Sequence, residues 1–298
     1  FGRFTQALDV VGHELTHGVI SHECNLAYQG ESGALNEHFA DVFGLLVKQW
    51  KLKQSADQAD WLVGADVLGP ATRARALRDM GPDAAYVDDP LLGTDPQPKH
   101  RDAQYDGTAD SGGVHINSGI PNHAFYRFAK ALGGPAWKLP GGIWYEAMRK
   151  LSSDSSFTDM VATTAMIAAA RKAAKIAAEH AADVDANARF PHEAFEALKR
   201  ERLLGLMIPA AQGGEQASLP AIAEICAILS QACSSTGMVY AMHQIKASSL
   251  VVHGGDDPWH AGFMERIARE QLLLASATTE GGGVGGDLRS SVCGVVRE

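Results

Sequence analysis

The hydrophobic and polar positions of this chain repeat mostly with the period of an α-helix, and alternation typical of strands is nearly absent. Apolar residues recur three and four positions apart, which places them on one helix face. Such patterns predict helices over residues 8–23, 33–52, 121–132, 143–151, 158–188, after Ser218, 234–251 and 263–274. Only Val292 to Val296, at the end of the chain, resembles the start of a strand. The pattern therefore predicts a mainly α fold with a short, unfinished β segment at the C-terminus.

Residues 54–113 interrupt this helical pattern. Proline and glycine punctuate the segment at Pro70, Gly81-Pro82, Pro90 and Gly112-Gly113, as expected of turns and loops. A loop of this length is unusual in a compact domain unless it has a function. We therefore expect it to wrap around a binding cleft.

Composition narrows the classes of partner. The 298 residues suffice for one large or two ordinary domains, and 46% of them are hydrophobic. The net charge of −9 and the pI near 5.7 argue against nucleic acid or an anionic membrane surface as a partner. The chain has no apolar run long enough for a membrane span. Its four cysteines show no C-x-x-C spacing, so no disulfide framework is indicated.

Candidate chemistry concentrates in the first predicted helix, in the stretch Gly12-His13-Glu14-Leu15-Thr16-His17-Gly18. Histidines four apart lie on one helix face, so both imidazoles can reach the same cation. Glu14 lies beside them, where a carboxylate could take a proton from water. A chance match on an ordinary helix is the alternative. A catalytic zinc site needs a third protein ligand, and Glu37 in the second helix is the candidate, although a solvated surface carboxylate is the usual role of such a residue.

A third block, Asp110 to Ile120, contains His115 after two glycines. Together with the first two blocks it resembles the thermolysin family of zinc metallopeptidases over residues 1 to about 170. The resemblance implies zinc held by His13, His17 and Glu37, with Glu14 as general base. It implies that Asn36 and Asp41 orient the two histidines. His115 and Tyr28 would stabilise the oxyanion, with Asp110 orienting His115. Arg78 would line the pocket for the residue after the scissile bond.

The same resemblance implies a peptide or protein substrate with an apolar residue after the scissile bond. It also implies an upstream β-rich domain that forms one wall of the cleft. The chain begins at Phe1, directly before the first motif, so zinc binding with weak proteolysis is expected of it. The sequence gives little support for a calcium site, because Lys48 and Ala65 occupy positions where members of the resembled family have acidic residues. We interpret Lys48 as part of a basic patch at the end of its helix, and the aspartates of the long loop as solvated.

From about Ala173 onward the sequence resembles another family, the acyl-CoA dehydrogenase flavoproteins. Its markers are Phe190-Pro191-His192, Leu203 to Pro209 and Gly213-Gly214. The resemblance implies a helical N-terminal domain, with Thr278 and Thr279 where such proteins contact the flavin. FAD binding would require the rest of that fold.

These resemblances predict two domains, residues 1–172 and 173–298. The favoured function is zinc-dependent hydrolysis of peptide bonds. The alternatives are a fragment of a flavin-dependent acyl-CoA oxidoreductase, a helical interaction module, or an inactive fusion of the two parts. If the peptidase resemblance determines the location, the protein is expected to be secreted. If the dehydrogenase resemblance does, a cytoplasmic location is expected. The oligomeric state stays open.

Overall fold

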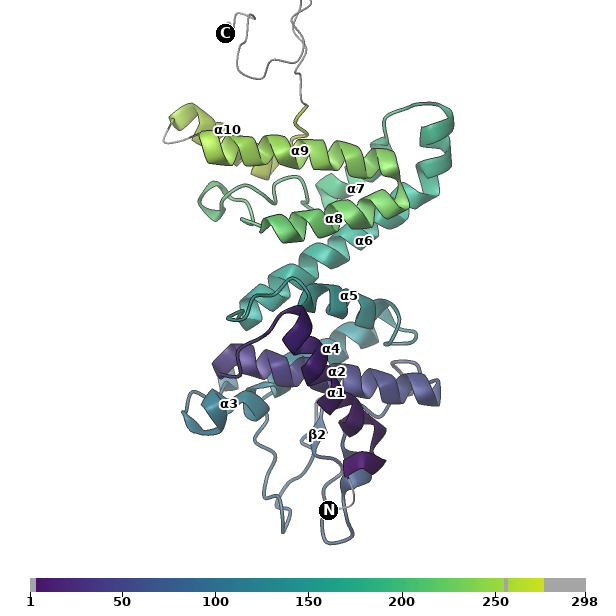
Figure 1. The fold of residues 1–298 in the computed structure, drawn as a ribbon, viewed down its shortest axis with the longest axis vertical. Coiled ribbons are helices and arrows are strands. Elements are labelled where there is room, and N and C mark those ends of the chain that lie inside the picture. The colour runs from purple at the N-terminus through teal and green to yellow at the C-terminus, as the bar shows by residue number, and fades with distance from the viewer. Residues whose placement is uncertain (1–3, 255–256, 276–298) are drawn as a thin grey trace, which may run out of the picture. The chain divides into compact units, whose positions relative to one another are not determined.

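The computed structural model describes residues 4–254 and 257–275 (Figure 1). It is mainly helical, which confirms the expected fold class. The predicted strand near Val292, and the candidate flavin contacts Thr278 and Thr279, lie outside the described residues. Within the described part, no helix is both long and apolar enough to cross a membrane.

The chain divides into two compact units, Phe1–Ala165 and Met166–Glu298. The helices and strands of the first unit are η1 (Phe4–Gln6), α1 (Leu8–Glu23), α2 (Gly30–Leu52), β1 (Leu62–Val63), η2 (Ala65–Val67), β2 (Arg78–Asp79), η3 (Arg101–Ala103), α3 (Ala109–Asn117), α4 (Gly119–Leu132) and α5 (Leu139–Met148). The division falls inside α6 (Phe157–Ala186), and the second unit continues with α7 (His192–Arg200), η4 (Ala210–Gln212), α8 (Leu219–Ala232), α9 (Ser234–His253) and α10 (Pro258–Glu270). The predicted boundary at residue 172 stays a prediction.

The first unit is built around the crossing of α1 and α2, which lie against each other (Figure 1). Two glycines form the crossing point. A Cβ atom on Gly12 would lie 2.9 Å from Gly44 Cα, and one on Gly44 would lie 2.8 Å from the backbone nitrogen of His13. Real side chains do not tolerate such contacts, so only glycine lets the two backbones approach this closely. The crossing thus fixes the distance between the face of α1 that carries His13 and the facing side of α2.

The structure corrects the predicted start of the second helix. Its first turn begins at Gly30, not Gly33, because Gly30 adopts φ 55° after the extended Gln29 and turns the chain into the helix. Glu31 then lies in the first turn, where a carboxylate stabilises the positive end of the helix.

The long segment between α2 and α3 is largely irregular, as predicted. It is anchored by the antiparallel pair of β1 and β2, in which Leu62 is opposite Asp79 and Val63 opposite Arg78. This pairing places Arg78 against α2. The loop aspartates are not all solvated. Asp89 is buried and accepts hydrogen bonds from the backbone nitrogens of Arg73, Leu91 and Leu92, so it ties the loop to itself.

Lys48 does not belong to the exposed end of α2, and the sequence-based interpretation of it as part of a basic patch is wrong. Its side chain is buried, and its Nζ donates to the backbone oxygen of Leu62 over 3.1 Å. Nζ also lies 3.5 Å from carboxylate oxygens of Asp9 and Asp60. Asp9 is fully buried and accepts a further hydrogen bond from the backbone of Gly64. The ammonium group thus supplies the positive charge that this buried carboxylate needs.

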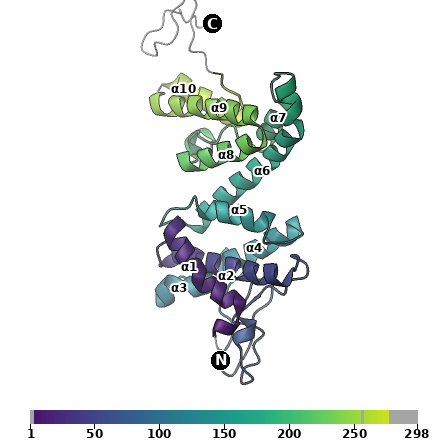
Figure 2. The same ribbon diagram turned by 45° about the vertical axis from the view of Figure 1, so that its right-hand side comes forward.

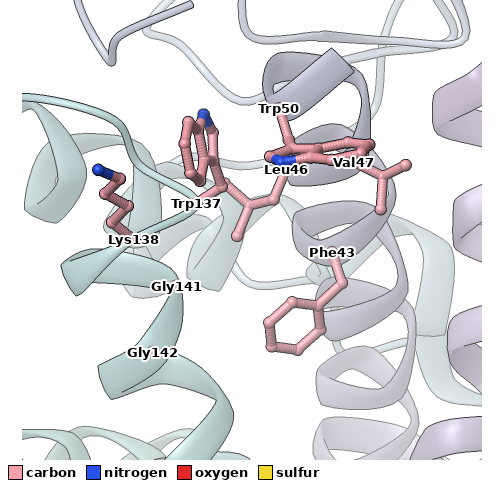
Figure 3. Close-up of a pocket in the computed structure, with 8 residues that line it drawn as sticks. All are labelled: Phe43, Leu46, Val47, Trp50, Trp137, Lys138, Gly141 and Gly142. Atoms are coloured by element: carbon pink, nitrogen blue, oxygen red, sulfur yellow. The ribbon is translucent and has the colours of Figure 1, made fainter. Parts of the chain in front are cut away.

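The C-terminal half of α2 borders an open apolar pocket of about 390 Å³ in the first unit (Figure 3). Phe43, Val47 and Trp50 project from α2, and Trp137 faces them from the segment that precedes α5. Trp50 is half exposed, and the ammonium of Lys53 lies 4.5 Å from its ring centre. On this side of α2, Phe43 contacts Tyr145 of α5, whereas Val47 and Trp50 are 41% and 50% exposed.

In the second unit α8 and α9 lie side by side, and α10 packs against α9 (Figures 1 and 2). Ile208, Ala247, Met264 and Ile267 form one of its core clusters. Not every apolar residue of α9 is buried. Met238, Met242 and Ile245 are exposed by 65%, 40% and 57%, because they lie on the face opposite the buried Tyr240, His243 and Ala247.

The glycine crossing gives a first prediction. Gly44→Ala should destabilise the first unit by about 1–3 kcal/mol, because overpacking forces α1 and α2 apart. Gly18→Ala is the matched control, since Gly18 is an exposed helical glycine of α1 whose Cβ would meet no atom within 4 Å. That change should stabilise the helix by about 0.5–1 kcal/mol. Urea unfolding followed by circular dichroism measures both, and equal midpoints for the two variants would contradict the tight crossing.

The buried ion pair gives a second prediction. Lys48→Met keeps most of the side-chain volume but leaves Asp9 buried without its cation, so the free energy of unfolding should fall by about 3–5 kcal/mol. Lys51→Met removes the same charge one turn away at an exposed position and should change it by less than about 0.5 kcal/mol. Thermal or urea unfolding of both variants provides the comparison. A loss of stability no larger for Lys48→Met than for Lys51→Met would show that Lys48 has no such role.

Candidate metal and catalytic site

Two histidines and one glutamate converge where α1 crosses α2. His13 and His17 project from α1 and Glu37 from α2, with candidate ligand atoms within 4.8 Å of one another. The two Nε2 atoms are 3.1 Å apart, His13 Nε2 is 3.4 Å from Glu37 Oε2, and His17 Nε2 is 3.6 Å from Glu37 Oε1. Three ligand atoms that bind one tetrahedral zinc at about 2.05 Å lie about 3.3 Å apart. The spacing therefore suits a single small cation.

The far side of each imidazole ring is hydrogen-bonded to an oxygen. His13 Nδ1 lies 2.9 Å from Asp41 Oδ1, and His17 Nδ1 lies 2.8 Å from Asn36 Oδ1. The amide nitrogen of Asn36 donates to the backbone oxygen of Leu26, which fixes its Oδ1 toward His17. Both Nδ1 atoms thus donate to these oxygens, and both Nε2 atoms point into the space between the rings, where each could bind a cation once it is free of its proton.

These atoms together favour a positive charge at their centre. Glu37 is almost fully buried, and its Oε2 has no hydrogen-bond partner among the described residues. Burial lowers the pKa of His13, but the adjacent carboxylates of Asp41 and Glu37 outweigh this and raise that pKa to about 9. A metal ion would replace the proton that these groups attract, because it can bind the ring nitrogens of His13 and His17 and the carboxylate of Glu37 at the same time.

Asp41 connects this cluster to the long loop. Arg78 binds its carboxylate through two bonds, Nε to Oδ2 at 2.7 Å and Nη2 to Oδ1 at 2.6 Å. Burial would raise the pKa of Asp41, but Arg78 and His13 outweigh it and hold that pKa well below its usual range. The carboxylate therefore stays charged. The guanidinium of Arg78 is mostly buried in this contact, and its predicted role in a substrate pocket remains a prediction.

Tyr28 and His115 lie on the open side of the cluster. The Tyr28 hydroxyl donates to Glu37 Oε1 and lies 3.2 Å from His115 Nε2. His115 Nδ1 lies 2.7 Å from Asp110 Oδ1, and the backbone nitrogen of His115 donates to the other oxygen of Asp110. Both rings are about half exposed, so their polar atoms can reach a bound substrate.

The backbone before His115 explains the glycines of that block. Asp110 and Ser111 have φ 55° and 51°, and Gly112 and Gly113 have 82° and 77°. This left-handed turn brings Asp110 back to the first turn of the helix that carries His115. A Cβ on Gly113 would also meet the ring of Tyr105. Glycine is the residue that adopts this conformation without strain.

The structure thus brings together eight of the predicted site residues in one network: His13, His17, Tyr28, Asn36, Glu37, Asp41, Asp110 and His115. Arg78 joins them through Asp41, and Glu14 is exposed on α1 directly after His13. The sequence-based analysis missed three buried residues of the network, namely His38, Asn122 and Trp144. His38 might have been noticed as the neighbour of Glu37, but no spacing relates it to the other two.

Comparison with known proteins finds a matching family model for each part of the chain. Residues 24–188 match the family model described as thermolysin metallopeptidase, alpha-helical domain, which is more than half of the chain. Residues 162–271 match the model described as acyl-CoA dehydrogenase, N-terminal domain. The two matches overlap within α6.

Individual relatives agree with the first match. An extracellular metalloprotease of Pectobacterium carotovorum is 53% identical over 148 residues, which cover 50% of this chain and 43% of that protein. Protease PrtS of Photorhabdus is 48% identical over 168 residues, covering 55% and 45%. The solved precursor of protealysin, a metalloproteinase from Serratia proteamaculans, has a TM-score of 0.53 and 50% identity, covering 55% of this chain and 51% of that one.

The chain spans less than half the length of these curated relatives. Within that span the match includes the second helix, with Glu37, and the block around His115. The geometry of the cluster and the family match lead to one conclusion: the chain belongs to the thermolysin metallopeptidase family and carries its alpha-helical domain.

Proposed function

We propose that this chain carries the catalytic site of a zinc-dependent endopeptidase, with His13, His17 and Glu37 as the metal ligands. One observation carries the proposal. Two imidazole Nε2 atoms and a buried carboxylate with an unpartnered oxygen face one point at the spacing of a single tetrahedral ion. Asn36 and Asp41 fix the ring orientations, as ligand-orienting groups do in zinc sites.

When bound, zinc would polarise the scissile carbonyl and increase the acidity of water at the site. The chain's own residues would transfer the protons and stabilise the negative charge of the oxyanion. The exposed carboxylate of Glu14 would accept a proton from the attacking water and deliver it to the leaving amine nitrogen. Tyr28 Oη and His115 Nε2, 3.2 Å apart, would donate hydrogen bonds to the oxyanion. Asp110 would keep His115 in the orientation that this requires.

The substrate we infer is a peptide or protein, with an apolar residue after the scissile bond. We also propose that the protein is secreted, because the relative from Pectobacterium is named as extracellular.

The second unit is considered separately from the peptidase site. Its match to the acyl-CoA dehydrogenase N-terminal domain favours a helical scaffold, either as a fragment of a flavin-dependent oxidoreductase or as a helical module joined to an otherwise separate peptidase part.

Two sets of variants test the peptidase proposal. The chain should bind one equivalent of zinc by metal analysis after dialysis, and the double variant His13→Ala, His17→Ala should bind none. Glu14→Gln should keep the full equivalent while its hydrolysis of an internally quenched peptide with leucine after the scissile bond falls by about 10²- to 10⁴-fold. Equal zinc in the parent and the double variant would refute the ligand assignment, and unchanged hydrolysis by Glu14→Gln would refute the role of Glu14.

A further inference from the structure

A continuous line of buried hydrogen bonds leads from α5 to His13. Trp144 Nε1 donates to His38 Nε2 over 2.7 Å, and His38 Nδ1 lies 2.7 Å from Asn122 Oδ1. Asn122 Nδ2 donates to Asp41 Oδ2 over 2.9 Å, and Asp41 Oδ1 lies 2.9 Å from His13 Nδ1. His38, Asn122 and Asp41 are completely buried, and Trp144 and His13 are exposed by 6% and 7%. The line therefore connects four helices without access to water.

The tryptophan at its end fixes the direction of every bond. An indole N–H can only donate, so His38 Nε2 must accept and the ring proton of His38 must lie on Nδ1. His38 then donates to the Asn122 carbonyl oxygen, which turns the Asn122 amide nitrogen toward Asp41. Asp41 is left to accept from His13 Nδ1, so the other ring nitrogen of His13, Nε2, faces Glu37. All the donors and acceptors along the line are satisfied in this one arrangement.

We propose that His38 is a positioning residue for the metal site, acting through Asn122 and Asp41 on the imidazole of His13. This inference rests on the proposed function, since the metal is the group that His13 would serve. Arg78 neutralises Asp41 from the loop side through one bond to each carboxylate oxygen. Asn122 supplies a third, independent contact from α4, and His38 locks Asn122 in the amide orientation that can donate.

A purely structural role would have different consequences. If His38 only filled space between α2, α4 and α5, an apolar side chain of similar size would cost stability but leave zinc affinity alone. If it sets the orientation of Asp41, removing its polar atoms leaves the buried Asn122 carbonyl oxygen without a donor, so the amide shifts and its bond to Asp41 weakens. The loss would then appear in metal binding, because second-sphere partners of a metal-binding histidine govern its geometry.

Zinc dissociation constants, measured on the full chain by competition with a chromophoric chelator, test the proposal. His38→Leu should weaken zinc binding by about 10-fold, the lower end of the range for loss of an outer-sphere partner. His38→Gln can accept from Trp144 and donate to Asn122, so it should bind zinc like the parent chain. Met148→Ala, a fully buried truncation on the same helix as Trp144, is the control and should lower stability without changing zinc affinity. Parental affinity in a folded His38→Leu variant would overturn the proposal.

Nitrogen-15 NMR of the histidine rings in metal-free parent chain provides a second test that needs neither a variant nor zinc. His38 should be neutral with its proton on Nδ1, and that proton should exchange slowly with water. A His38 ring protonated on Nε2 would overturn the hydrogen-bond direction and the proposal with it. Failure of the proposed function would look different, because the parent chain would then bind no zinc while His38 still showed the expected tautomer.

Discussion

The close approach of α1 and α2 at Gly12 and Gly44 is the constraint on which the site depends. Helices that carried side chains at this crossing would be held further apart, and the imidazoles of α1 would no longer meet the carboxylate of α2. The same crossing buries Asp9 of the first turn of α1, where Lys48 and the backbone of Gly64 compensate its charge. Backbone proximity, an internal ion pair and a cation-binding cluster are thus consequences of one packing arrangement.

Next to the metal-ligand cluster, buried polar groups bond to other groups of the chain. Asp41 shows this most clearly, with His13, Arg78 and Asn122 all bonded to its two oxygens. In a medium of low dielectric constant such networks hold their members in one geometry, because every alternative leaves a polar atom unpaired. At the centre of the cluster, Glu37 Oε2 has no hydrogen-bond partner among the described residues and faces two imidazole nitrogens. A carboxylate oxygen and two ring nitrogens directed at one point are what a site prepared for a cation requires.

Some of this arrangement could be predicted from the sequence, and the reason lies in the range of the interactions. The four-residue spacing of His13 and His17 places them on one helix face whatever the rest of the chain does. Glu37 and Asp41 are likewise one helical turn apart. The partnership of Asp110 with His115 is local too, made by a glycine-rich turn of five residues. These features follow from helix geometry and turn chemistry, and the family resemblance supplied their expected roles.

Side-chain contacts between elements far apart in the sequence could not be predicted from helix geometry or turn chemistry. His38 is separated from Asn122 by 84 residues and from Trp144 by 106, and no periodicity relates them. Lys48 was misassigned for the same reason, since its partner Asp9 lies 39 residues away in another helix. The exposed Met238 and Ile245 of α9 show a related limit, because hydrophobicity identifies a face without showing that the described chain covers it.

The most direct test of the central claim is X-ray absorption spectroscopy at the zinc edge on the zinc-loaded chain. The account predicts a first shell of two imidazole nitrogens and oxygen atoms, with bond lengths of about 2.0–2.2 Å, and loss of one imidazole contribution in His17→Ala. A shell with one imidazole or none, or a spectrum unchanged in His17→Ala, would contradict the convergence of His13, His17 and Glu37 on a single ion.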